Sequence, residues 1–344
     1  MAHQSLYRTY RPKTFKEVVG QEQITNSLAE QIKEKKVAHA YLFAGSRGLG
    51  KTSIARIFAR ELGTSERDIY EIDAASNNSV DDIRSLTENV YTLPFESPQK
   101  VYILDEAHML SKGAWNAFLK TLEEPPAHAI FILATTELSK VPETVQSRCQ
   151  VYEFKRPTRA TLAKLVTEIA KKEDRTIEPA AADLVALLGD GSYRDALSIL
   201  EKVFATAGKS ITREDAELAT GAPKLELVEA FVSALSEGNA DKALSAIRKT
   251  EKQSVDMALY LSLVLEQVRT MLLVRFAPEL RKEIAEELGT DAYATVEKVA
   301  QTKDSRLTHQ SLKVLLDATE RMRFSPVPSL PLELAVFELL GQDK

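Results

Sequence analysis

Short apolar runs alternate with amphipathic stretches through the first half of the chain. The apolar runs, which predict buried strands, lie at 39–44, 68–75, 100–104, 129–134 and 150–154. Apolar residues at helical spacing predict helices over 22–36, 54–62, 80–90 and 111–122, and a short helical turn at 141–145. This alternation predicts an α/β domain with a parallel five-stranded sheet, whose ligands bind at the carboxyl ends of the strands.

The pattern changes after Lys155-Arg156-Pro157, because every later periodic segment is helical. The predicted helices cover 158–173, 179–189, 193–207 and 212–219, and they are followed by a helical block that runs to the last helix at 332–340. Residues 259–272 are apolar around most of their circumference, which predicts a core helix. We therefore expect an α/β domain at 1–156, a small helical domain at 157–221 and an all-helical domain at 222–344, the last with a packing role.

Composition narrows the class of protein. The chain has 344 residues, of which 44% are hydrophobic and 28% charged, and no apolar run approaches the roughly 18 residues of a membrane span. Its first twelve residues are polar and basic, unlike a secretory signal. The single cysteine, Cys149, excludes an internal disulfide and a cysteine-built zinc site. These features predict a cytoplasmic protein without a membrane partner, and the net charge of −5 gives no general support to nucleic-acid binding.

A glycine-rich loop lies between the first predicted strand and the helix that follows it. Residues 45–53 match the pattern G-x-x-x-x-G-K-[ST] at every fixed position. In this setting backbone N–H groups and a helix N-terminus point at a polyphosphate, whereas the alternative is a glycine turn that happens to precede a lysine. The expected nucleotide-binding residues are Gly45, Ser46, Arg47, Gly48, Leu49, Gly50, Lys51, Thr52 and Ser53. The sequence therefore predicts a nucleoside triphosphate site, with Lys51 on the terminal phosphates and Thr52 on magnesium.

Polar residues follow two of the other strands. The third strand runs into Asp105 and Glu106, which we expect to hold magnesium and to orient and polarise the attacking water, respectively. Thr136, at the tip of the fourth strand, is a candidate to bind the γ-phosphate or the water, although it could be an ordinary strand-end threonine. Together with the glycine loop, these residues indicate nucleotide hydrolysis.

The remaining candidates are less specific. Residues 5–21 are rich in aromatic residues and arginine, so they could wall a base or form a packed N-terminal arm; the candidates there are Tyr7, Arg8, Arg11, Pro12, Val18 and Val19. The helix N-termini near Asn78-Ser79 and Ser111-Lys112 could donate to DNA phosphates, and Lys100 could add a charge. These could equally be helix caps and solvated side chains.

Together the motifs resemble the AAA+ ATPases and, more narrowly, the gamma/tau family of bacterial DNA polymerase III clamp-loader subunits. The stretches that carry the resemblance are 7–12, 39–43, 71–76, 119–126, 147–149 and 194–197. It implies that Lys51 and Thr52 bind phosphate and magnesium and that Asp105 and Glu106 are the Walker B acids. It also places Thr136 at sensor 1, Arg194 at sensor 2, and Arg148 at an arginine finger that acts in trans on a neighbour's ATP.

The resemblance implies an AAA+ domain, a helical lid and an oligomerisation collar, with ATP and Mg²⁺ as cofactors. The implied activity is that of an ATP-hydrolysing motor subunit that opens a sliding clamp and loads it on primed DNA. The implied partners are delta and delta-prime type subunits, further copies of the chain in a pentameric ring, the sliding clamp and primer-template DNA, near the nucleoid. The alternatives are a non-hydrolysing clamp-loader subunit and another AAA+ machine that remodels DNA or protein.

Two departures from the family pattern stand out. Residues 63–68 close, without any cysteine, the gap where the family usually carries a four-cysteine zinc module, so we expect no zinc. The 344 residues extend through the third predicted domain, so by the resemblance we expect a gamma-like length without the long extension of the tau form.

Overall fold

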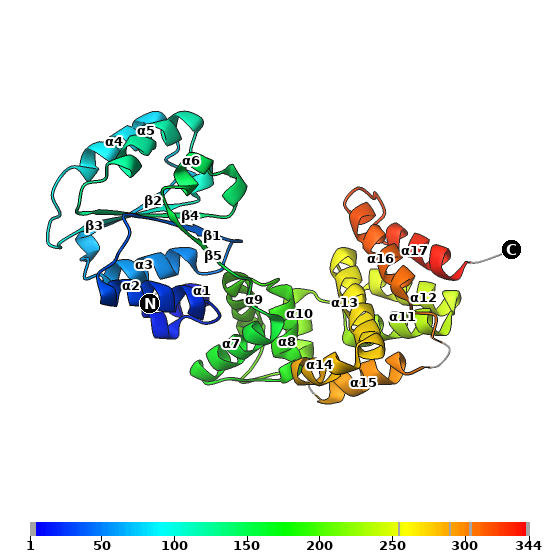
Figure 1. Cartoon of the computed structure of the whole chain (residues 1–344). Coiled ribbons are helices and arrows are strands. Elements are labelled where there is room, and N and C mark those ends of the chain that lie inside the picture. The colour runs from blue at the N-terminus through cyan, green and yellow to red at the C-terminus, as the bar shows by residue number, and fades with distance from the viewer. Residues whose placement is uncertain (1–4, 254, 289, 303–304, 342–344) are drawn as a thin grey trace. The chain divides into compact units, whose positions relative to one another are not determined.

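The computed structural model describes residues 5–253, 255–288, 290–302 and 305–341 (Figure 1). The chain forms two compact units. The first consists of Met1–Leu162 with Gly189–Ser198, and the second of Ala163–Leu188 with Ile199–Lys344. The predicted division at 157–221 and 222–344 stays a prediction, because the second unit contains residues of both of these segments.

The first unit is built on a sheet of five parallel strands in the order β2-β3-β4-β1-β5. The strands are β1 (Ala40–Ala44), β2 (Ile69–Asp73), β3 (Lys100–Asp105), β4 (Ala129–Thr135) and β5 (Gln150–Glu153). Every residue of β1 and β4 is buried, which explains why these strands read as unbroken apolar runs rather than as alternating ones. The predicted parallel sheet is confirmed.

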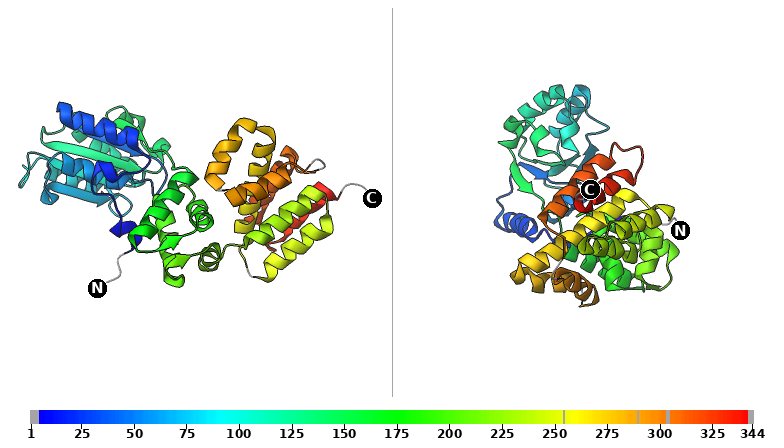
Figure 2. Two further views of the ribbon diagram at one scale, coloured as in Figure 1. Left: turned by 90° about the horizontal axis from the view of Figure 1, so that it is seen from below. Right: turned by 90° about the vertical axis from the view of Figure 1, so that its right-hand side faces the viewer.

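Helices cover both faces of this sheet (Figures 1 and 2). On one face lie α2 (Glu22–Glu34) and α3 (Lys51–Glu61), which bury Leu28 and Phe58 against β1 and β3. The other face carries α4 (Val80–Val90), α5 (Lys112–Glu123) and α6 (Glu143–Gln146), with Trp115 and Phe118 in the core. The shorter elements of the unit are α1 (Leu6–Thr9), η1 (Phe15–Glu17), η2 (Glu66–Asp68), η3 (Ala107–Met109) and η4 (Leu138–Lys140).

The rest of the chain is mainly helical, as predicted. The division between the units passes through α7 (Arg159–Lys172) and α9 (Tyr193–Thr206). The second unit also holds α8 (Pro179–Leu188), α10 (Arg213–Thr220), α11 (Leu225–Glu237), α12 (Ala240–Lys252), α13 (Met257–Phe276), η5 (Pro278–Leu280), α14 (Arg281–Leu288), α15 (Thr290–Ala300), α16 (His309–Met322) and α17 (Leu330–Leu340). The expectation that this region is entirely helical is wrong in one detail, because β6 (Thr176–Ile177) and β7 (Ser210–Ile211) form a short parallel pair.

Helix α13 corrects the expectation that no segment is apolar enough to span a membrane. By length and composition this 20-residue helix does qualify, because an 18-residue window within it has a mean hydropathy of 1.5. Half of that window is buried within the fold, and Tyr260, Val264 and Val268 lie in the core of the helical unit. Its apolar circumference is thus explained by neighbours on several sides, which is typical of the core helix that the sequence predicts here.

The connection from α3 to β2 is closed by a buried carboxylate. Asp68 is fully buried, and its carboxylate accepts backbone N–H bonds from Phe95 (2.6 Å), Glu96 (2.8 Å) and Ser97 (2.8 Å). Burial raises the pKa of Asp68, but these bonds outweigh it and lower the pKa to about 2. The short segment without cysteines is therefore tied to the loop before β3. Among the described residues no group of three or more His, Cys, Asp or Glu could hold a metal ion.

We expect Asp68→Asn to lower the free energy of unfolding by about 2 kcal/mol at neutral pH, because buried N–H donors lose a charged acceptor. The pKa of Asp68 is about 2 in the folded state and 3.8 in the unfolded state, so its ionised carboxylate stabilises the fold at pH values above 3.8. This stabilisation is lost as the pH falls from 3.8 toward about 2. Denaturant unfolding at several pH values should therefore show the gap between wild type and variant closing below pH 4. The control is Asp81→Asn, whose side chain is 89% exposed. A gap that is absent at neutral pH, or one that does not depend on pH, would contradict this account.

Candidate nucleotide-binding and hydrolysis site

The glycine loop connects β1 to α3 and requires its glycines. Gly45, Gly48 and Gly50 have φ values of 147°, 77° and 92°. A Cβ on Gly45 would lie 2.9 Å from the backbone oxygen of Phe154, and one on Gly48 would lie 2.0 Å from Ser192 Oγ. All three glycines therefore have a backbone conformation that other residues rarely adopt, and at Gly45 and Gly48 the packing also leaves no room for a Cβ.

Lys51 places a cation inside this loop. The side chain is buried, and its Nζ donates to the carbonyl oxygens of Gly45 (2.7 Å) and Ser46 (2.8 Å). Burial lowers the pKa of Lys51, while the nearby carboxylates of Glu106 and Asp105 act in the opposite direction. The ammonium group is thus held at the first turn of α3, where a polyphosphate would also meet the positive end of the helix.

Thr52 and Asp105 form the pair that fits magnesium. The Thr52 hydroxyl donates to Asp105 Oδ2 at 2.8 Å, which joins the start of α3 to the end of β3. Mg²⁺ usually takes one or two protein oxygens, with phosphate oxygens and waters as its other ligands. These two oxygens meet that requirement beside the phosphate loop.

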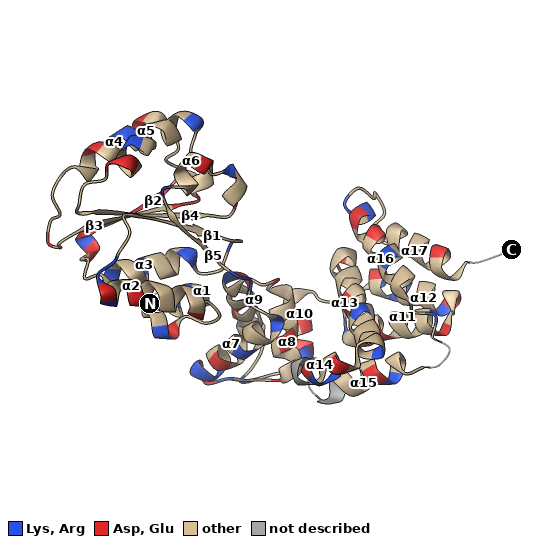
Figure 3. Ribbon diagram, in the orientation of Figure 1, with Lys and Arg blue, Asp and Glu red and all other residues tan. Residues whose placement is uncertain are grey.

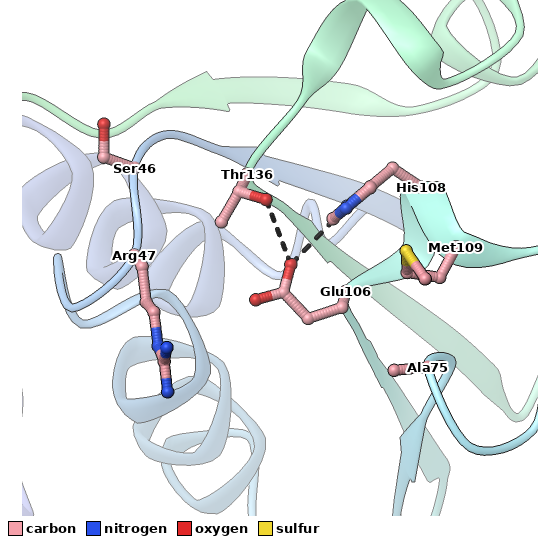
Figure 4. Close-up of a pocket in the computed structure, with 7 residues that line it drawn as sticks. All are labelled: Ser46, Arg47, Ala75, Glu106, His108, Met109 and Thr136. Atoms are coloured by element: carbon pink, nitrogen blue, oxygen red, sulfur yellow. Dashed lines mark hydrogen bonds and ion pairs between the residues drawn. The ribbon is translucent and has the colours of Figure 1, made fainter. Parts of the chain in front are cut away.

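Glu106 occupies a strained position just beyond the tip of β3. Its φ of 48° is in the left-handed region, which a non-glycine residue adopts at a cost. The Thr136 hydroxyl donates to Glu106 Oε2 at 3.2 Å, and His108 Nδ1 lies 3.5 Å from the same oxygen. Figure 4 shows both side chains directed at the carboxylate from two different elements. The strand ends thus hold an acid in a fixed place, as a group that activates water requires.

A cavity of about 470 Å³ opens between these elements. Its lining includes four residues that the sequence predicts, Ser46, Arg47, Glu106 and Thr136, and also Ala75, His108 and Met109. No sequence pattern predicted these last three as site residues. His108 had a signal, since it lies two residues after the second acid, Glu106, and its Nε2 lies 3.5 Å from Glu137 Oε1.

Two distant segments meet the phosphate loop within the same unit. From the N-terminal segment, Arg11 Nε donates to Ser53 Oγ at 2.8 Å. From the segment 189–198, the Tyr193 backbone N–H donates to Gly48 O at 3.1 Å, and its hydroxyl donates to Val19 O at 2.6 Å. Arg194 lies over the ring of Tyr7 at 4.8 Å. The structure therefore brings together the N-terminal candidates and the expected sensor arginine.

The other N-terminal candidates lie around these contacts. Val18 packs against the core face that contains α3, and Arg8 Nε donates to the Tyr7 hydroxyl at 3.2 Å. Pro12 lies between α1 and η1. Arg156, which the sequence analysis did not assign to the site, donates from Nε to Ser46 Oγ at 3.3 Å. Its only sequence signal was its place where the pattern of strands ends.

Arg148 lies apart from this cluster. Its guanidinium bonds Glu123 Oε1 (2.7 Å), the Thr144 carbonyl oxygen (2.6 Å) and Ser147 Oγ (3.4 Å). Within the described residues it contacts none of the phosphate-loop residues and is not part of the cavity lining. The predicted site therefore has one cluster around Lys51 and Glu106 and one separate cation.

Comparisons with known proteins place the chain in a family. A family model described as DNA polymerase III, delta subunit, matches residues 20–79 and 63–158. The chain is 38% identical to DNA polymerase III subunit tau of Bacillus subtilis, with 98% of this chain and 63% of that protein aligned. It is 34% identical to the gamma/tau subunit of Mycobacterium tuberculosis (98% and 62%) and 32% identical to subunit tau of Escherichia coli (99% and 56%). The chain belongs to the DNA polymerase III gamma/tau family.

This gamma/tau-family chain spans between 56% and 63% of the length of these three relatives. Among solved structures it is similar to Thermotoga maritima RuvB, a Holliday junction branch migration motor, with a TM-score of 0.55 and 20% identity over 89% of this chain and 98% of that one. That likeness shows the AAA+ fold. The predicted family and fold class are both confirmed.

Of the candidates for DNA contact, Lys100 is buried, and the two helix N-termini lie next to each other. Lys100 is only 3% exposed, and its Nζ donates to Asn89 O (3.1 Å) and Thr92 Oγ1 (2.6 Å), so it is not available to a DNA phosphate. Ser79 and Ser111 cap α4 and α5, and the Ser111 backbone N–H donates to Asn78 O, so these two helix N-termini adjoin. Their role in DNA contact stays a prediction. Figure 3 shows acidic and basic residues interspersed along most of the described helices.

Two substitutions should separate binding from turnover. Lys51→Ala removes the buried cation that faces the phosphates, so we expect ATP affinity to fall at least tenfold and hydrolysis to become undetectable. Glu106→Gln changes only the carboxylate that Thr136 contacts, so binding should stay within about twofold while turnover falls by about 10²–10⁴. Equilibrium binding of a fluorescent ATP analogue and phosphate release would measure both effects. Hydrolysis by Glu106→Gln at the wild-type rate would show that another group activates the water.

Proposed function

We propose that this chain is an ATP-hydrolysing motor subunit of a bacterial clamp loader, which opens a sliding clamp and places it on primed DNA. The proposal rests mainly on two hydrogen-bonded pairs, Thr52 with Asp105 and Thr136 with Glu106, which lie beside the glycine loop that holds Lys51. Thr52 with Asp105 would hold Mg²⁺, and Thr136 with Glu106 would hold the water that attacks ATP. Membership of the gamma/tau family supports the proposal.

The remaining residues have assigned tasks in this proposal. Lys51 and the loop N–H groups would bind the β- and γ-phosphates, and the residues around Tyr7, Arg11 and Val19 would border the base. Arg194, beside the loop in the segment 189–198, would sense the nucleotide. Bound Mg²⁺ would neutralise charge on the phosphates. The absence of a zinc module stays a prediction, which metal analysis of the purified chain would test.

Arg148 is proposed to act in trans, on ATP held by a neighbouring subunit. Its position apart from its own phosphate loop supports this role, as does its chemistry, because a planar cation supplied to the developing phosphoryl charge raises the rate by about 10³–10⁵. The proposal therefore requires a ring. We propose delta and delta-prime type subunits and further copies of this chain as its members, with five subunits in all.

The C-terminal helices supply a surface for such assembly. On α17, Leu332, Ala335 and Val336 face the core, while Leu330 (38%), Leu334 (42%) and Phe337 (52%) are exposed at helical spacing. An apolar stripe exposed on one helix is typical of a protein–protein contact. This supports the proposal that residues 222–344 form the oligomerisation collar.

Two other functions share this fold. A non-hydrolysing clamp-loader subunit is disfavoured by the complete phosphate loop and the Glu106–Thr136 pair. A different AAA+ machine, such as a branch-migration motor, is disfavoured by the near full-length similarity of this chain to gamma/tau subunits. The sliding clamp and primer-template DNA are therefore the proposed targets, near the nucleoid in the cytoplasm.

Turnover in a reconstituted complex tests this function. The chain alone should hydrolyse ATP slowly, because no neighbour supplies an arginine, and partner subunits with clamp and primed DNA together should raise the rate at least tenfold. A complex assembled with Lys51→Ala is the control. DNA binding by the complex should also weaken steeply as salt rises, since phosphate contacts displace counterions. A rate that clamp and primed DNA leave unchanged would contradict a clamp-loading role.

A further inference from the structure

Arg148 is held at one end by a carboxylate from another element. Glu123 is the last residue of α5, and its Oε1 accepts from Arg148 Nη2 at 2.7 Å. Nη1 of the same guanidinium donates to the carbonyl oxygen of Thr144, on the short helix α6, at 2.6 Å. Two acceptors from separate helices therefore fix the outer two nitrogens of this side chain.

The main chain at this position is anchored as well. The Arg148 backbone N–H donates to Val145 O at 3.0 Å, and the next residue, Cys149, packs against the core cluster that contains α5. Burial raises the pKa of the Cys149 thiol to about 12, so this side chain acts as a small neutral anchor. The arginine thus extends from a fixed backbone.

The held guanidinium still has a free edge. An arginine carries five N–H donors, and the bonds to Glu123, Thr144 and Ser147 all use Nη1 or Nη2. Among the described residues Nε has no partner, and the side chain is 34% exposed. An anion outside this chain could therefore meet the Nε side of a guanidinium that is already oriented.

The local setting of Glu123 points to a reason other than stability. A carboxylate in the last turn of a helix opposes the helix dipole, so this position favours a base instead. The side chains of Glu123 and Arg148 are 49% and 34% exposed, and an ion pair so open to water contributes little to folding. Glu123 destabilises the end of α5 slightly, and its ion pair contributes little to the stability of the fold. The ion pair does, however, restrict the orientations that the Arg148 guanidinium can adopt.

We propose that Glu123 is a positioning residue for Arg148. It orients the guanidinium so that the free edge meets the γ-phosphate of ATP held by a neighbouring subunit. This inference rests on the proposed function, because it concerns how the finger is prepared for its reaction in trans. Pre-orientation matters since a misplacement of about 1 Å can cost about 10²-fold in rate.

The test compares adjacent glutamates in the assembled complex. Glu123→Gln removes the charge and half of the acceptor capacity, while Glu124→Gln alters the neighbouring exposed acid, for which the described residues show no side-chain partner. With partner subunits, clamp and primed DNA present, Glu123→Gln should lower kcat about tenfold. The KM for ATP and the ATP affinity of the isolated chain should stay within about twofold, and Glu124→Gln should match wild type throughout. Thermal unfolding of both variants is the check that they fold.

A double-mutant cycle shows whether Glu123 acts through Arg148. In the Arg148→Ala background, Glu123→Gln should have no further effect on kcat, because the group it orients is gone. The inference is overturned if Glu123→Gln turns over ATP at the wild-type rate or faster, or if it lowers the rate equally in both backgrounds. Failure of the proposed function looks different, since Arg148→Ala itself would then retain wild-type turnover.

Discussion

The candidate site depends on a single buried cation that the fold holds at the meeting point of three parallel strands. Lys51 lies at the start of α3, directly after the loop that leaves β1, and its Nζ bonds two carbonyl oxygens of that loop. Because β1 pairs with β4 and β4 with β3, the ends of all three strands lie beside it. Thr136 and the acids Asp105 and Glu106 reach this place for the same reason. A cation kept dry in this way interacts with phosphate more strongly than one in water would.

Much of this arrangement could be predicted from the sequence. Strands buried on both faces appear as unbroken apolar runs, and the glycine loop has fixed spacing, so β1, β3, β4 and the loop were all placed within one or two residues. The ends of parallel strands share one edge of a sheet, which is why Asp105 and Thr136 could be assigned to the same site. Local sequence patterns therefore suffice to predict site residues that lie in the glycine loop or at the end of a strand, because the element itself determines their position.

Contacts between distant segments could not be predicted in this way. Lys100 was one candidate for DNA contact, with a solvated side chain as the alternative. A lysine at a strand start can instead turn inward when carbonyl and hydroxyl oxygens satisfy its ammonium group, as those of Asn89 and Thr92 do. Asp68 likewise has no local signal, because its donors lie about thirty positions later in the chain. The ion pair of Glu123 with Arg148 joins the end of α5 to the turn between α6 and β5 and depends on tertiary packing alone.

The proposed role of Arg148 requires that each active site be shared by two subunits, and mixing two inactive variants tests this most directly. A Lys51→Ala chain keeps its arginine finger, and an Arg148→Ala chain keeps its phosphate loop. Complexes that contain both chains should form some intact sites. With clamp and primed DNA, their ATP turnover should therefore exceed the sum of the turnover rates of complexes assembled with each variant alone. Mixed complexes that are verified to contain both chains and yet show no gain, or an Arg148→Ala complex as active as wild type, would contradict the account.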